Sequence, residues 1–596
     1  FNFCVVFPVA MGTISCLAIY FLGKDIGGEA VGLFSALFLA LNPSYIGRTS
    51  LGFFDDETVG IFGIILFMIF FLRAVEEKVS FKKSLLYSVA SGLSLGYITA
   101  SWGAARYPIA MTALFALVLL LMRQYSTRLL VSYGVTFGVT LFICVNVPKL
   151  GFEFLREATL MPVYGVLLLM CIFEAYSRMR TRRLKVICIG GIIALSVVAF
   201  ALLWSMGYVK PLKAKFISTL NPFLRSSYPL FESVAEHKPS AWATFYYDLG
   251  VGVLFLPLGI FFAVQMGTRR GIFLIIYGLT AIYFASTMIR LTLILAPAVS
   301  LLWALAVVRL ARPFIVLLKE KTAPTKRRAR FRPRLGKEFS GAAVLVIFLL
   351  LVFNFVIGTD FMMGPRAQGP RVFSQAYSPV TIAAASLPVK PSSTVTDWFE
   401  ALAWMREELP PSPPYGPTVV ASWWDYGYWI TTIGNKTSLA DNQTFNWTQI
   451  EQIAKMFMSP VNESIKILKR YNVTHVLVFT SITKDGWDLP YGEAGKFKWM
   501  IKIAGLNETK FGRDVFSGGR SYWEWSSYGK NTTLYLMMTY GKYMKVPDSQ
   551  YVQSEYWGVY QNFELFNKHF KLVYYSKGEA VNNAYYALIL IYEVKY

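Results

Sequence analysis

Long apolar runs fill the first 360 residues of the chain and then stop. Each run is about 18 to 22 residues long, enough for a helix to cross the ~30 Å hydrocarbon core of a bilayer. The pattern predicts twelve membrane-spanning helices, over residues 3–22, 28–42, 57–75, 84–101, 104–122, 129–147, 160–176, 186–206, 247–266, 271–288, 291–310 and 341–360.

The rest of the chain has a different pattern. It is rich in proline and aromatic residues, and it contains short apolar segments such as Thr474–Phe479. Such segments are typical of strands in a soluble domain. We therefore predict an α-helical polytopic membrane domain over residues 1–360, followed by a mixed α/β extracytoplasmic domain over residues 361–596.

Composition agrees with a membrane protein. Hydrophobic residues make up 55% of the 596 residues, charged residues make up 16%, and the mean hydropathy is +0.45. A soluble domain of this size carries more charge. All five cysteines lie in the apolar half, at spacings that match neither a metal site nor a redox pair.

The net charge of +23 raises the question of nucleic acid, but the basic residues are confined to short loops between spans. The most basic loops lie at 177–185, 267–270 and 311–338, and alternation of the spans puts all three on one side, together with the loops around Lys24, at 76–83 and at 123–128. Basic loops face the cytoplasm in membrane proteins. We therefore expect membrane lipid as a partner, no nucleic acid, and outer-face positions for the loops 43–56 and 207–246 and for the soluble domain.

Two features of the chain's ends complete the topology. Seven Asn-X-Ser/Thr sequons lie in the tail placed outside, where glycan acceptors belong, although such sequons are also common in soluble loops. The chain opens inside an apolar span without a methionine, and we expect its natural start to lie upstream.

The first chemical motif lies in an early outer loop, where Asp55, Asp56 and Glu57 stand at the start of a predicted span, close after Arg48. Oxygen ligands suit hard divalent cations such as Mn²⁺ or Mg²⁺. Carboxylates at a membrane edge are costly without a partner. The alternative is that acidic residues in a first helical turn complement the helix dipole.

Two further motifs lie on the same predicted face. Ser233-Val234-Ala235-Glu236 lies in a late outer loop, where a solvated loop is the default interpretation. Trp423-Trp424-Asp425-Tyr426-Gly427 opens the soluble domain. Paired aromatic residues are typical of a folded core or an interfacial belt, but an aspartate among them also suits a pocket that binds a small hydroxyl.

The order of these three motifs resembles that of the catalytic subunit of oligosaccharyltransferases, along nearly the whole chain. The segments Asp441–Thr448 and Glu493–Met500 are similar to the same family, the latter with glutamate where aspartate is usual. The resemblance implies a GT-C membrane fold with thirteen spans, of which the first and a catalytic aspartate in its loop would be missing. It favours an archaeal member that acts as a single subunit in the cell membrane, or in the endoplasmic reticulum membrane if the source is eukaryotic.

By this resemblance the enzyme transfers an oligosaccharide from a dolichyl phosphate-type carrier to asparagine in Asn-X-Ser/Thr, with inversion. The implied metal ligands for Mn²⁺ or Mg²⁺ are Asp55 and Glu57. Glu236 would complete the site around the acceptor asparagine, with charge support from Arg48. The implied sequon-binding residues are Trp423, Trp424, Asp425, Lys496 and Met500, and the implied lipid-donor-binding residues are Arg290 and Tyr426.

Two other functions stay open on sequence alone. A different lipid-phosphate-sugar glycosyltransferase, such as a protein mannosyltransferase, would share the acidic loop but has no need of the Trp-Trp-Asp-Tyr-Gly motif. A transporter with an extracellular domain would show paired charges or broken helices within spans, and few ionisable residues lie there.

Overall fold

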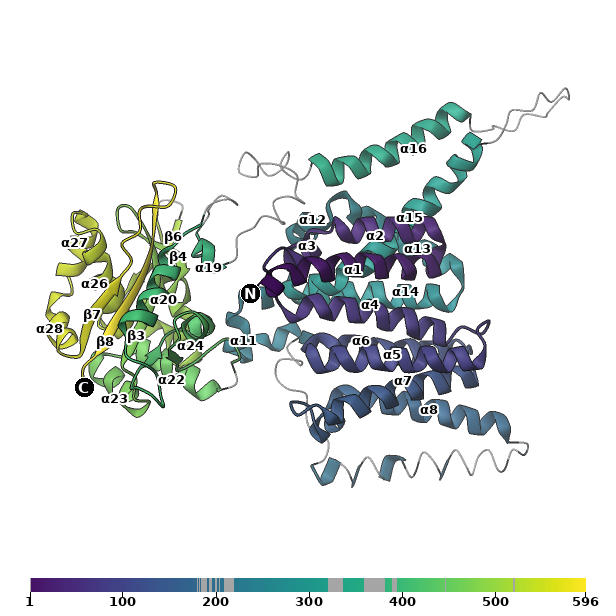
Figure 1. Cartoon of the computed structure of the whole chain (residues 1–596), viewed down its shortest axis with the longest axis horizontal. Coiled ribbons are helices and arrows are strands. Elements are labelled where there is room, and N and C mark those ends of the chain that lie inside the picture. The colour runs from purple at the N-terminus through teal and green to yellow at the C-terminus, as the bar shows by residue number, and fades with distance from the viewer. Residues whose placement is uncertain are drawn as a thin grey trace. The chain divides into compact units, whose positions relative to one another are not determined.

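The apolar half of the chain folds into long helices, drawn from purple to teal in Figure 1. The computed structural model describes residues 2–179, parts of 181–207, 219–319, 336–357, 381–387, 394–444, 446–517 and 520–596. The chain divides into two compact units, Phe1–Ser378 and Pro379–Tyr596. The main helices of the first unit are α1 (Asn2–Gly27), α2 (Glu29–Ala40), α3 (Pro43–Thr49), α4 (Asp56–Ala74), α5 (Phe81–Ser101), α6 (Arg106–Leu121), α7 (Thr127–Asn146), α8 (Met161–Arg178), α11 (Pro229–Ser233), α12 (Trp242–Leu249), α13 (Phe255–Met266), α14 (Arg269–Thr287), α15 (Thr292–Lys319) and α16 (Lys337–Val352).

Eight helical segments of the described chain are long and apolar enough to cross a membrane, and a ninth is the pair α2 and α3, which is bent by 62°. By this measure nine of the twelve predicted spans are found among the described residues, and the other three are those over 84–101, 186–206 and 247–266. Helix α5 is present, but its serines make it less apolar than its neighbours. The span predicted over 247–266 is broken at Gly250, where α12 ends and a short 3-10 turn precedes α13. The span predicted over 186–206 lies largely outside the described residues.

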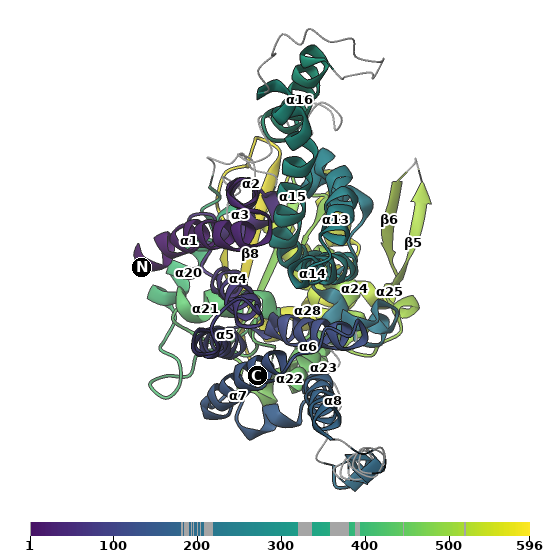
Figure 2. The same cartoon turned by 90° about the vertical axis from the view of Figure 1, so that its right-hand side faces the viewer.

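Helix α15 lies at the centre of the first unit. It packs against α2, α13 and α14, as the view along the helices shows (Figure 2). In the apolar 18-residue stretch of Ile289–Lys319, 89% of the residues are buried. In the corresponding stretch of Lys337–Phe355, which contains α16, only 6% are buried. Small residues allow such close packing of membrane helices. At Gly259 of α13, for example, an added Cβ atom would lie 2.4 Å from the Leu302 carbonyl oxygen of α15.

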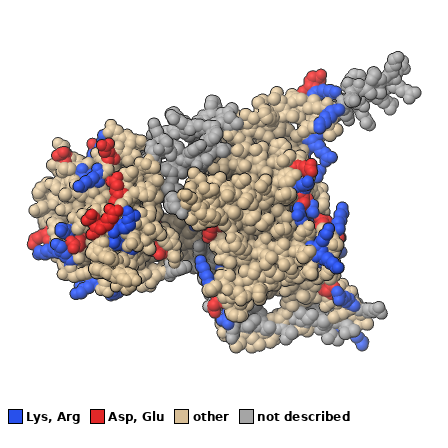
Figure 3. All heavy atoms as spheres, viewed as in Figure 1, with Lys and Arg blue, Asp and Glu red and all other residues tan. Residues whose placement is uncertain are grey.

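Charged side chains gather at one end of the helical unit, along its right-hand edge in Figure 3. Arg73 forms an ion pair of 2.6 Å with Asp25, and Arg269 forms one of 2.6 Å with Glu77. Arg269 also donates to the Gln124 carbonyl at 3.1 Å. Four of the loops predicted to share the cytoplasmic side therefore meet at this end of the unit.

The second unit is built on a six-stranded mixed sheet. The strand order is β2-β1-β3-β8-β7, with β4 paired to β3. Strands β1 and β3 run parallel, whereas β8 runs antiparallel to both β3 and β7. The bounds are β1 (Val419–Ala421), β2 (Thr437–Ser438), β3 (His475–Thr483), β4 (Asp488–Gly492), β7 (Phe570–Tyr575) and β8 (Tyr585–Val594).

Helices bury the centre of this sheet. Eight of the nine residues of β3 are buried, which is the pattern of a strand covered on both faces. The helices of the second unit are α19 (Thr381–Ala384), α20 (Asp397–Glu408), α21 (Gly427–Thr432), α22 (Trp447–Met458), α23 (Val461–Arg470), α24 (Glu493–Ile503), α25 (Ser527–Lys530), α26 (Thr533–Lys545), α27 (Gln550–Trp557) and α28 (Tyr560–His569), and a separate hairpin is formed by β5 (Gly512–Ser517) and β6 (Arg520–Trp525).

Candidate functional site

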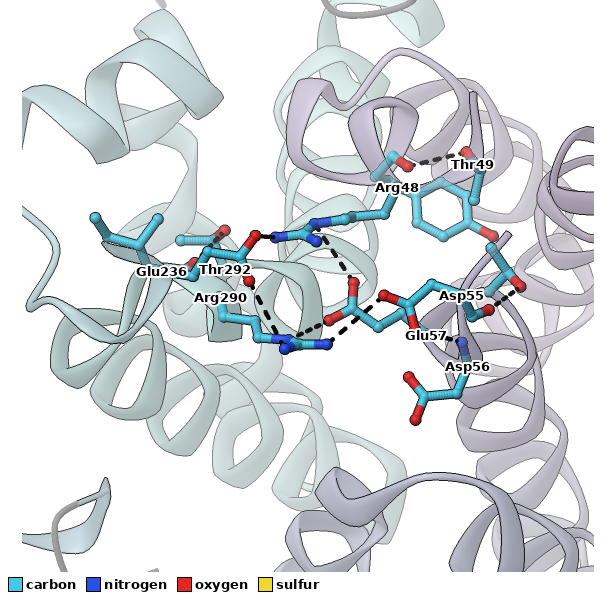
Figure 4. A network of polar contacts seen from close by, with 11 residues as sticks. Arg48, Thr49, Asp55, Asp56, Glu57, Glu236, Arg290 and Thr292 are labelled. Atoms are coloured by element: carbon cyan, nitrogen blue, oxygen red, sulfur yellow. Dashed lines mark hydrogen bonds and ion pairs between the residues drawn. The ribbon is translucent and has the colours of Figure 1, made fainter. Parts of the chain in front are cut away.

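Charged residues of the first unit converge at the end of α4 that is opposite to Arg73. We call them the carboxylate–arginine cluster, which comprises Arg48, Asp55, Glu57, Glu236 and Arg290 (Figure 4). Arg48 lies in the last turn of α3, Arg290 lies in the turn before α15, and Glu236 lies in a 3-10 turn of the loop after α11. The fold therefore brings together residues that are 188 and 233 positions apart in the sequence.

The start of α4 sets the direction of two of these carboxylates. Asp55 is the N-cap residue, and its Oδ1 accepts a hydrogen bond of 2.7 Å from the Asp56 amide. This capping bond satisfies one of the free amides of the first turn. The other carboxylate oxygen of Asp55, Oδ2, lies 3.7 Å from Arg290 Nη2. The exposed Asp56 forms no ion pair with either arginine in the described part of the chain, so it is not counted in the cluster.

Glu57 is the buried centre of the cluster, with a side chain that is 0% exposed. Its Oε1 accepts a bond of 2.5 Å from Arg290 Nε, and its Oε2 lies 3.4 Å from Arg48 Nε. Oε2 has no hydrogen-bond partner among the described residues. A buried carboxylate is stable only with such cationic neighbours. Arg290 is therefore held by carboxylates.

Glu236 joins the cluster from the long outer loop. Its Oε1 accepts a bond of 2.7 Å from Arg48 Nη2, and its Oε2 lies 3.7 Å from Arg290 Nη1. Its side chain is 41% exposed, so it can reach a ligand. Arg48 and Arg290 thus connect Glu57, which is buried, with Glu236, which is open to solvent.

Backbone contacts fix the loop that carries Glu236. Ser240 donates through its amide to the Ser286 carbonyl at 3.0 Å and through its hydroxyl to the Ala285 carbonyl at 2.6 Å. The Ile289 amide donates to the Lys238 carbonyl at 2.9 Å. Glu236 and Arg290 are therefore held on segments that bond directly to each other. Sequence reasoning did not identify Ser240, because a single serine in a loop gives no signal.

A second cluster lies in the second unit, at the carboxyl end of β1. We call it the tryptophan–lysine cluster, which comprises Trp423, Trp424, Asp425, Tyr426 and Lys496. The first four directly follow β1, and Lys496 lies in the first turn of α24, which begins after β4. Because β1 and β3 are parallel and β4 pairs with β3, the two segments meet at one edge of the sheet, where ligands bind in open sheets of this kind.

These two segments are in direct contact. Lys496 Nζ forms an ion pair with Asp425 Oδ2, lies 3.3 Å from the Tyr426 hydroxyl, and lies 4.9 Å from the centroid of the Tyr426 ring. Asp425 and Lys496 are 26% and 30% exposed. The Trp424 indole Nε1 is buried and has no hydrogen-bond partner among the described residues.

The other predicted sequon and donor residues of this unit are buried. Trp423 is 2% exposed, Tyr426 is 3% exposed and Met500 is 0% exposed. Burial raises the pKa of the Tyr426 hydroxyl well above its ordinary value. Of the predicted residues in this unit, Trp424, Asp425 and Lys496 are therefore the ones that reach the surface.

The buried Glu493 contacts this cluster through Tyr426. It is fully buried, its Oε2 accepts a bond of 3.0 Å from the Phe479 amide of β3, and the same oxygen lies 3.3 Å from the Tyr426 hydroxyl. Burial raises the pKa of its carboxyl group to about 8, and Lys496 opposes this shift. The departure from aspartate in the sequence thus falls on a buried residue that joins α24, β3 and Tyr426.

Two glycines allow the close approaches that build this edge of the sheet. Gly492 precedes α24 with a φ of +65°, and an added Cβ atom would lie 2.3 Å from the Phe479 carbonyl. Gly427 ends the Trp-Trp-Asp-Tyr-Gly motif, and an added Cβ atom would lie 2.3 Å from the Ala440 carbonyl. A side chain at either position would push the motif away from its neighbours.

The predicted metal site is only partly provided by the described residues. No group of three or more His, Cys, Asp or Glu side chains in this part of the chain is arranged to hold a metal ion. Asp55 and Glu57 supply two carboxylates at the start of α4, and Glu57 Oε2 lacks a hydrogen-bond donor. This donor set fits a hard cation that binds one or two carboxylates and takes its other ligands from water or substrate phosphate.

Comparisons with known sequences match the chain to one family. Residues 1–303 match the family described as oligosaccharyl transferase STT3, N-terminal. The chain is 30% identical over 527 residues to the dolichyl-diphosphooligosaccharide–protein glycosyltransferase subunit STT3B of Arabidopsis thaliana, covering 84% of this chain and 68% of the relative. It is 27% identical over 606 residues to the subunit STT3 of Dictyostelium discoideum, covering 100% of this chain and 80% of the relative.

Solved structures share the fold. The archaeal oligosaccharyltransferase AglB from Archaeoglobus fulgidus, in complex with an inhibitory peptide and a dolichol-phosphate, matches with a TM-score of 0.66 at 15% identity, over 100% of this chain and 77% of that one. An Archaeoglobus fulgidus oligosaccharyltransferase in complex with Zn and sulfate matches with a TM-score of 0.57 at 14% identity, over 100% and 77% of the two chains. At these identities the likeness concerns the fold.

Proposed function

The chain belongs to the STT3 family of oligosaccharyltransferases, and from this premise we propose how its two clusters carry out the reaction. The protein is a multi-pass membrane enzyme that transfers an oligosaccharide to asparagine side chains of proteins. The observation that carries our proposal is Glu57, a buried carboxylate held between two arginines at the end of a membrane helix, next to the open Glu236.

The reaction poses a problem of nucleophilicity. The nitrogen of a carboxamide is a poor nucleophile, because its lone pair is delocalised into the carbonyl group. Glu236 is 41% exposed and carries a carboxylate that can accept a hydrogen bond from the acceptor NH₂ group. Such a bond favours rotation of the amide out of conjugation. The nitrogen then attacks the anomeric carbon with inversion, the bond from that carbon to the phosphate oxygen breaks, and the proton that the nitrogen loses passes to the Glu236 carboxylate or to the departing phosphate.

Arg290 is suited to bind the phosphate that leaves. Its Nε is committed to Glu57 at 2.5 Å, whereas its terminal nitrogens make only contacts of 3.7 Å to Asp55 and Glu236. These terminal groups can donate to phosphate oxygens in the paired geometry that guanidinium groups favour. Arg48 holds Glu57 and Glu236 in place and so acts as a positioning residue.

Asp55 and Glu57 would hold a divalent cation, for which Mn²⁺ or Mg²⁺ fits the oxygen donors. When bound, such a cation stabilises the negative charge that develops on the phosphate leaving group. The Archaeoglobus relative solved with Zn and sulfate is consistent with a cation and an anion in this fold.

The tryptophan–lysine cluster is suited to the sequon hydroxyl. Asp425 offers a carboxylate acceptor, and Trp424 offers a buried indole N–H that lacks a partner among the described residues. A Ser/Thr hydroxyl satisfies both groups, and a side chain without a hydroxyl leaves them unpaired. Lys496 would then contact the threonine side chain, while the buried Trp423 and Met500 support the cluster from within. A donor-binding role for Tyr426 has no support from its burial.

The predictions on membrane orientation, subunit composition and source belong to the same proposal. We place the carboxylate–arginine cluster on the outer face, because loops predicted to be cytoplasmic meet at the opposite end of α4. An outer-face position for the second unit rests on the alternation of the predicted spans. The curated relatives are named as subunits, which gives no support to action as a single subunit. They are eukaryotic, and the solved structures are archaeal, so an archaeal source stays a prediction.

The test is direct. A fluorescent Asn-X-Thr peptide is incubated with membranes that contain the full chain and its lipid-linked donor, with Mn²⁺ added. We expect a glycosylated gel shift, with mass spectrometry placing the glycan on asparagine. A glycan on the threonine hydroxyl would instead support the mannosyltransferase alternative and overturn the proposal.

A further inference from the structure

A cavity of about 500 Å³ lies in the second unit and shares no residue with the tryptophan–lysine cluster. Its size is within the range of small-molecule sites, ~300 to 1,000 Å³. Three segments line it: the end of α26, the turn after β3, and the connection between β7 and β8. The side chains that matter for its chemistry are Lys484, Lys545, Lys577, Tyr575 and Tyr586.

The cavity carries an excess of positive charge. Its lining holds three lysines and one carboxylate, Glu579. Lys484 donates to the neutral amide oxygen of Asn583, and Lys545 donates to the carbonyls of Ser576 and Gly578 at 2.9 and 2.8 Å. In the described part of the chain, none of the three lysines forms an ion pair with a carboxylate. An anion in the cavity would supply this missing partner.

The electrostatics of Lys545 agree with this geometry. Its side chain is half-buried, and burial lowers the pKa of its amino group, while Asp397 and Glu400 act in the opposite direction. Its Nζ lies 4.8 Å from the centroid of the Tyr586 ring. A half-buried ammonium group of this kind gains more from a bound anion than an exposed lysine does.

The walls of the cavity are fixed by hydrogen bonds. The Lys484 amide donates to the Ala584 carbonyl at 3.1 Å, which ties the turn after β3 to the connection between β7 and β8. The two bonds of Lys545 tie the same connection to α26. At Gly578 an added Cβ atom would lie 2.5 Å from Asp397 Oδ1, so the chain passes there without room for a side chain. The cavity is therefore formed before any ligand binds.

We propose that this cavity binds an anionic sugar, meaning a pyranose ring that carries a carboxylate or a phosphate. The lysines recognise the charge, and the flat apolar faces of Tyr575 and Tyr586 suit the C–H face of the ring. The volume of about 500 Å³ favours one or two sugar units over an extended acidic peptide. The inference does not depend on the proposed transfer mechanism, because binding is measured without turnover.

The experiment titrates the purified full chain in detergent with glucuronic acid, glucose, inorganic phosphate and a hexaglutamate peptide, by calorimetry or saturation-transfer NMR. We expect glucuronic acid to bind at least about tenfold more tightly than glucose and than inorganic phosphate, because it uses both the lysines and the rings. Equal affinity for glucose would overturn the role of the charge. Equal affinity for phosphate, or tighter binding of a hexaglutamate peptide, would overturn the role of the sugar.

Matched variants test the location. The double variant Lys484→Gln, Lys577→Gln removes two exposed lysines of the cavity, and we expect it to weaken glucuronic acid binding about tenfold. The control is Lys530→Gln, Lys568→Gln, which removes the same charge from exposed positions of this unit outside the cavity. It should keep wild-type affinity. If both double variants lose affinity alike, or neither does, the assignment to this cavity is wrong.

Discussion

Each cluster contains a buried glutamate, and the two are stabilised in different ways. Glu57 lies within ion-pair distance of Arg48 and Arg290. Glu493 accepts hydrogen bonds from a backbone amide and lies near the Tyr426 hydroxyl, and burial raises the pKa of its carboxyl group to about 8. Cationic neighbours favour a charged carboxylate, whereas desolvation favours a protonated one. Burial alone therefore does not identify a carboxylate that acts on a ligand. The charge of its neighbours has to be considered as well.

The largest effect is expected at Glu57. Glu57→Gln should lower transfer at least about a thousandfold, because it removes a charge that holds both arginines and would hold the cation. It should also lower the melting temperature, since the arginines lose their buried partner. Initial rates of peptide glycosylation and a thermal melt of the same preparation measure both.

Its neighbours provide the controls. Asp55→Asn should lose comparable activity with little change in melting temperature, because Asp55 is 35% exposed. Asp56→Asn, which changes an exposed side chain outside the cluster, should stay within about threefold of wild-type activity. Equal losses in all three variants would contradict the assignment.

Arg290 comes next. Arg290→Ala should raise the apparent KM for the lipid-linked donor by about thirtyfold while the affinity for peptide stays unchanged, because the terminal nitrogens are proposed to bind phosphate. Donor titration at saturating peptide measures the first quantity, and fluorescence titration with peptide measures the second. An unchanged donor KM would return Arg290 to a purely structural role.

The tryptophan–lysine cluster should show a smaller and more selective effect. Asp425→Ala should weaken binding of an Asn-X-Thr peptide at least about tenfold, because the hydroxyl loses its acceptor. An Asn-X-Ala peptide lacks the hydroxyl and should lose little further affinity. Titration of both peptides against both proteins supplies the comparison, and equal losses for the two peptides would show that the segment is structural.

The pH dependence of stability tests the other half of the comparison. Because the pKa of Glu493 is raised from 4.5 to about 8, the folded protein holds a proton that the unfolded chain releases above pH 4.5. This contribution is complete below pH 4.5 and is lost as the pH rises to about 8, with a slope of up to about 1.4 kcal/mol per pH unit. Glu493→Gln should flatten the melting temperature between pH 5 and about 8. A parallel pH profile in the variant would rule out this account.

The smallest effect is expected at Ser240. Ser240→Ala removes one hydroxyl bond to Ala285 and leaves the amide bond to Ser286. Loss of one such bond corresponds to about 1 kcal/mol, or roughly a fivefold fall in transfer rate. The fall should be absent in an Arg48→Ala background, where Glu236 is already released. Additive losses would show that Ser240 does not act through Glu236.

The sequence predicted the positions of helices and motifs better than the contacts between them. The apolar runs identified most of the helices, because length and hydrophobicity are local properties. They failed at the 247–266 segment, where Gly250 breaks the helix. Helix α5 is present where a span was predicted, but it is less apolar than the other spans. Two of its serines bond to the neighbouring helix α4: Ser84 donates to the Ala74 carbonyl and Ser91 to the Phe67 carbonyl.

Motif order placed Arg48, Asp55 and Glu57 in one loop region, and the structure adds how they are joined. The pairing of Arg290 with Glu57 spans 233 residues, and no local pattern contains such information. The link from Glu493 to Tyr426 could not be predicted either, because a glutamate in the first turn of a helix is ordinarily exposed.

The enclosure of α15 has a consequence for how the enzyme responds to its bilayer. A helix that touches lipid must tilt or shift when membrane thickness changes. Helix α15 is surrounded by other helices, so its depth is set by protein packing, and Arg290 at its start keeps its height relative to Glu57. We expect α16, most of whose residues are not buried by protein, to adjust to the lipid instead. Hydrophobic mismatch would then be taken up at the periphery, and we expect the alignment of the reacting groups to depend little on acyl-chain length.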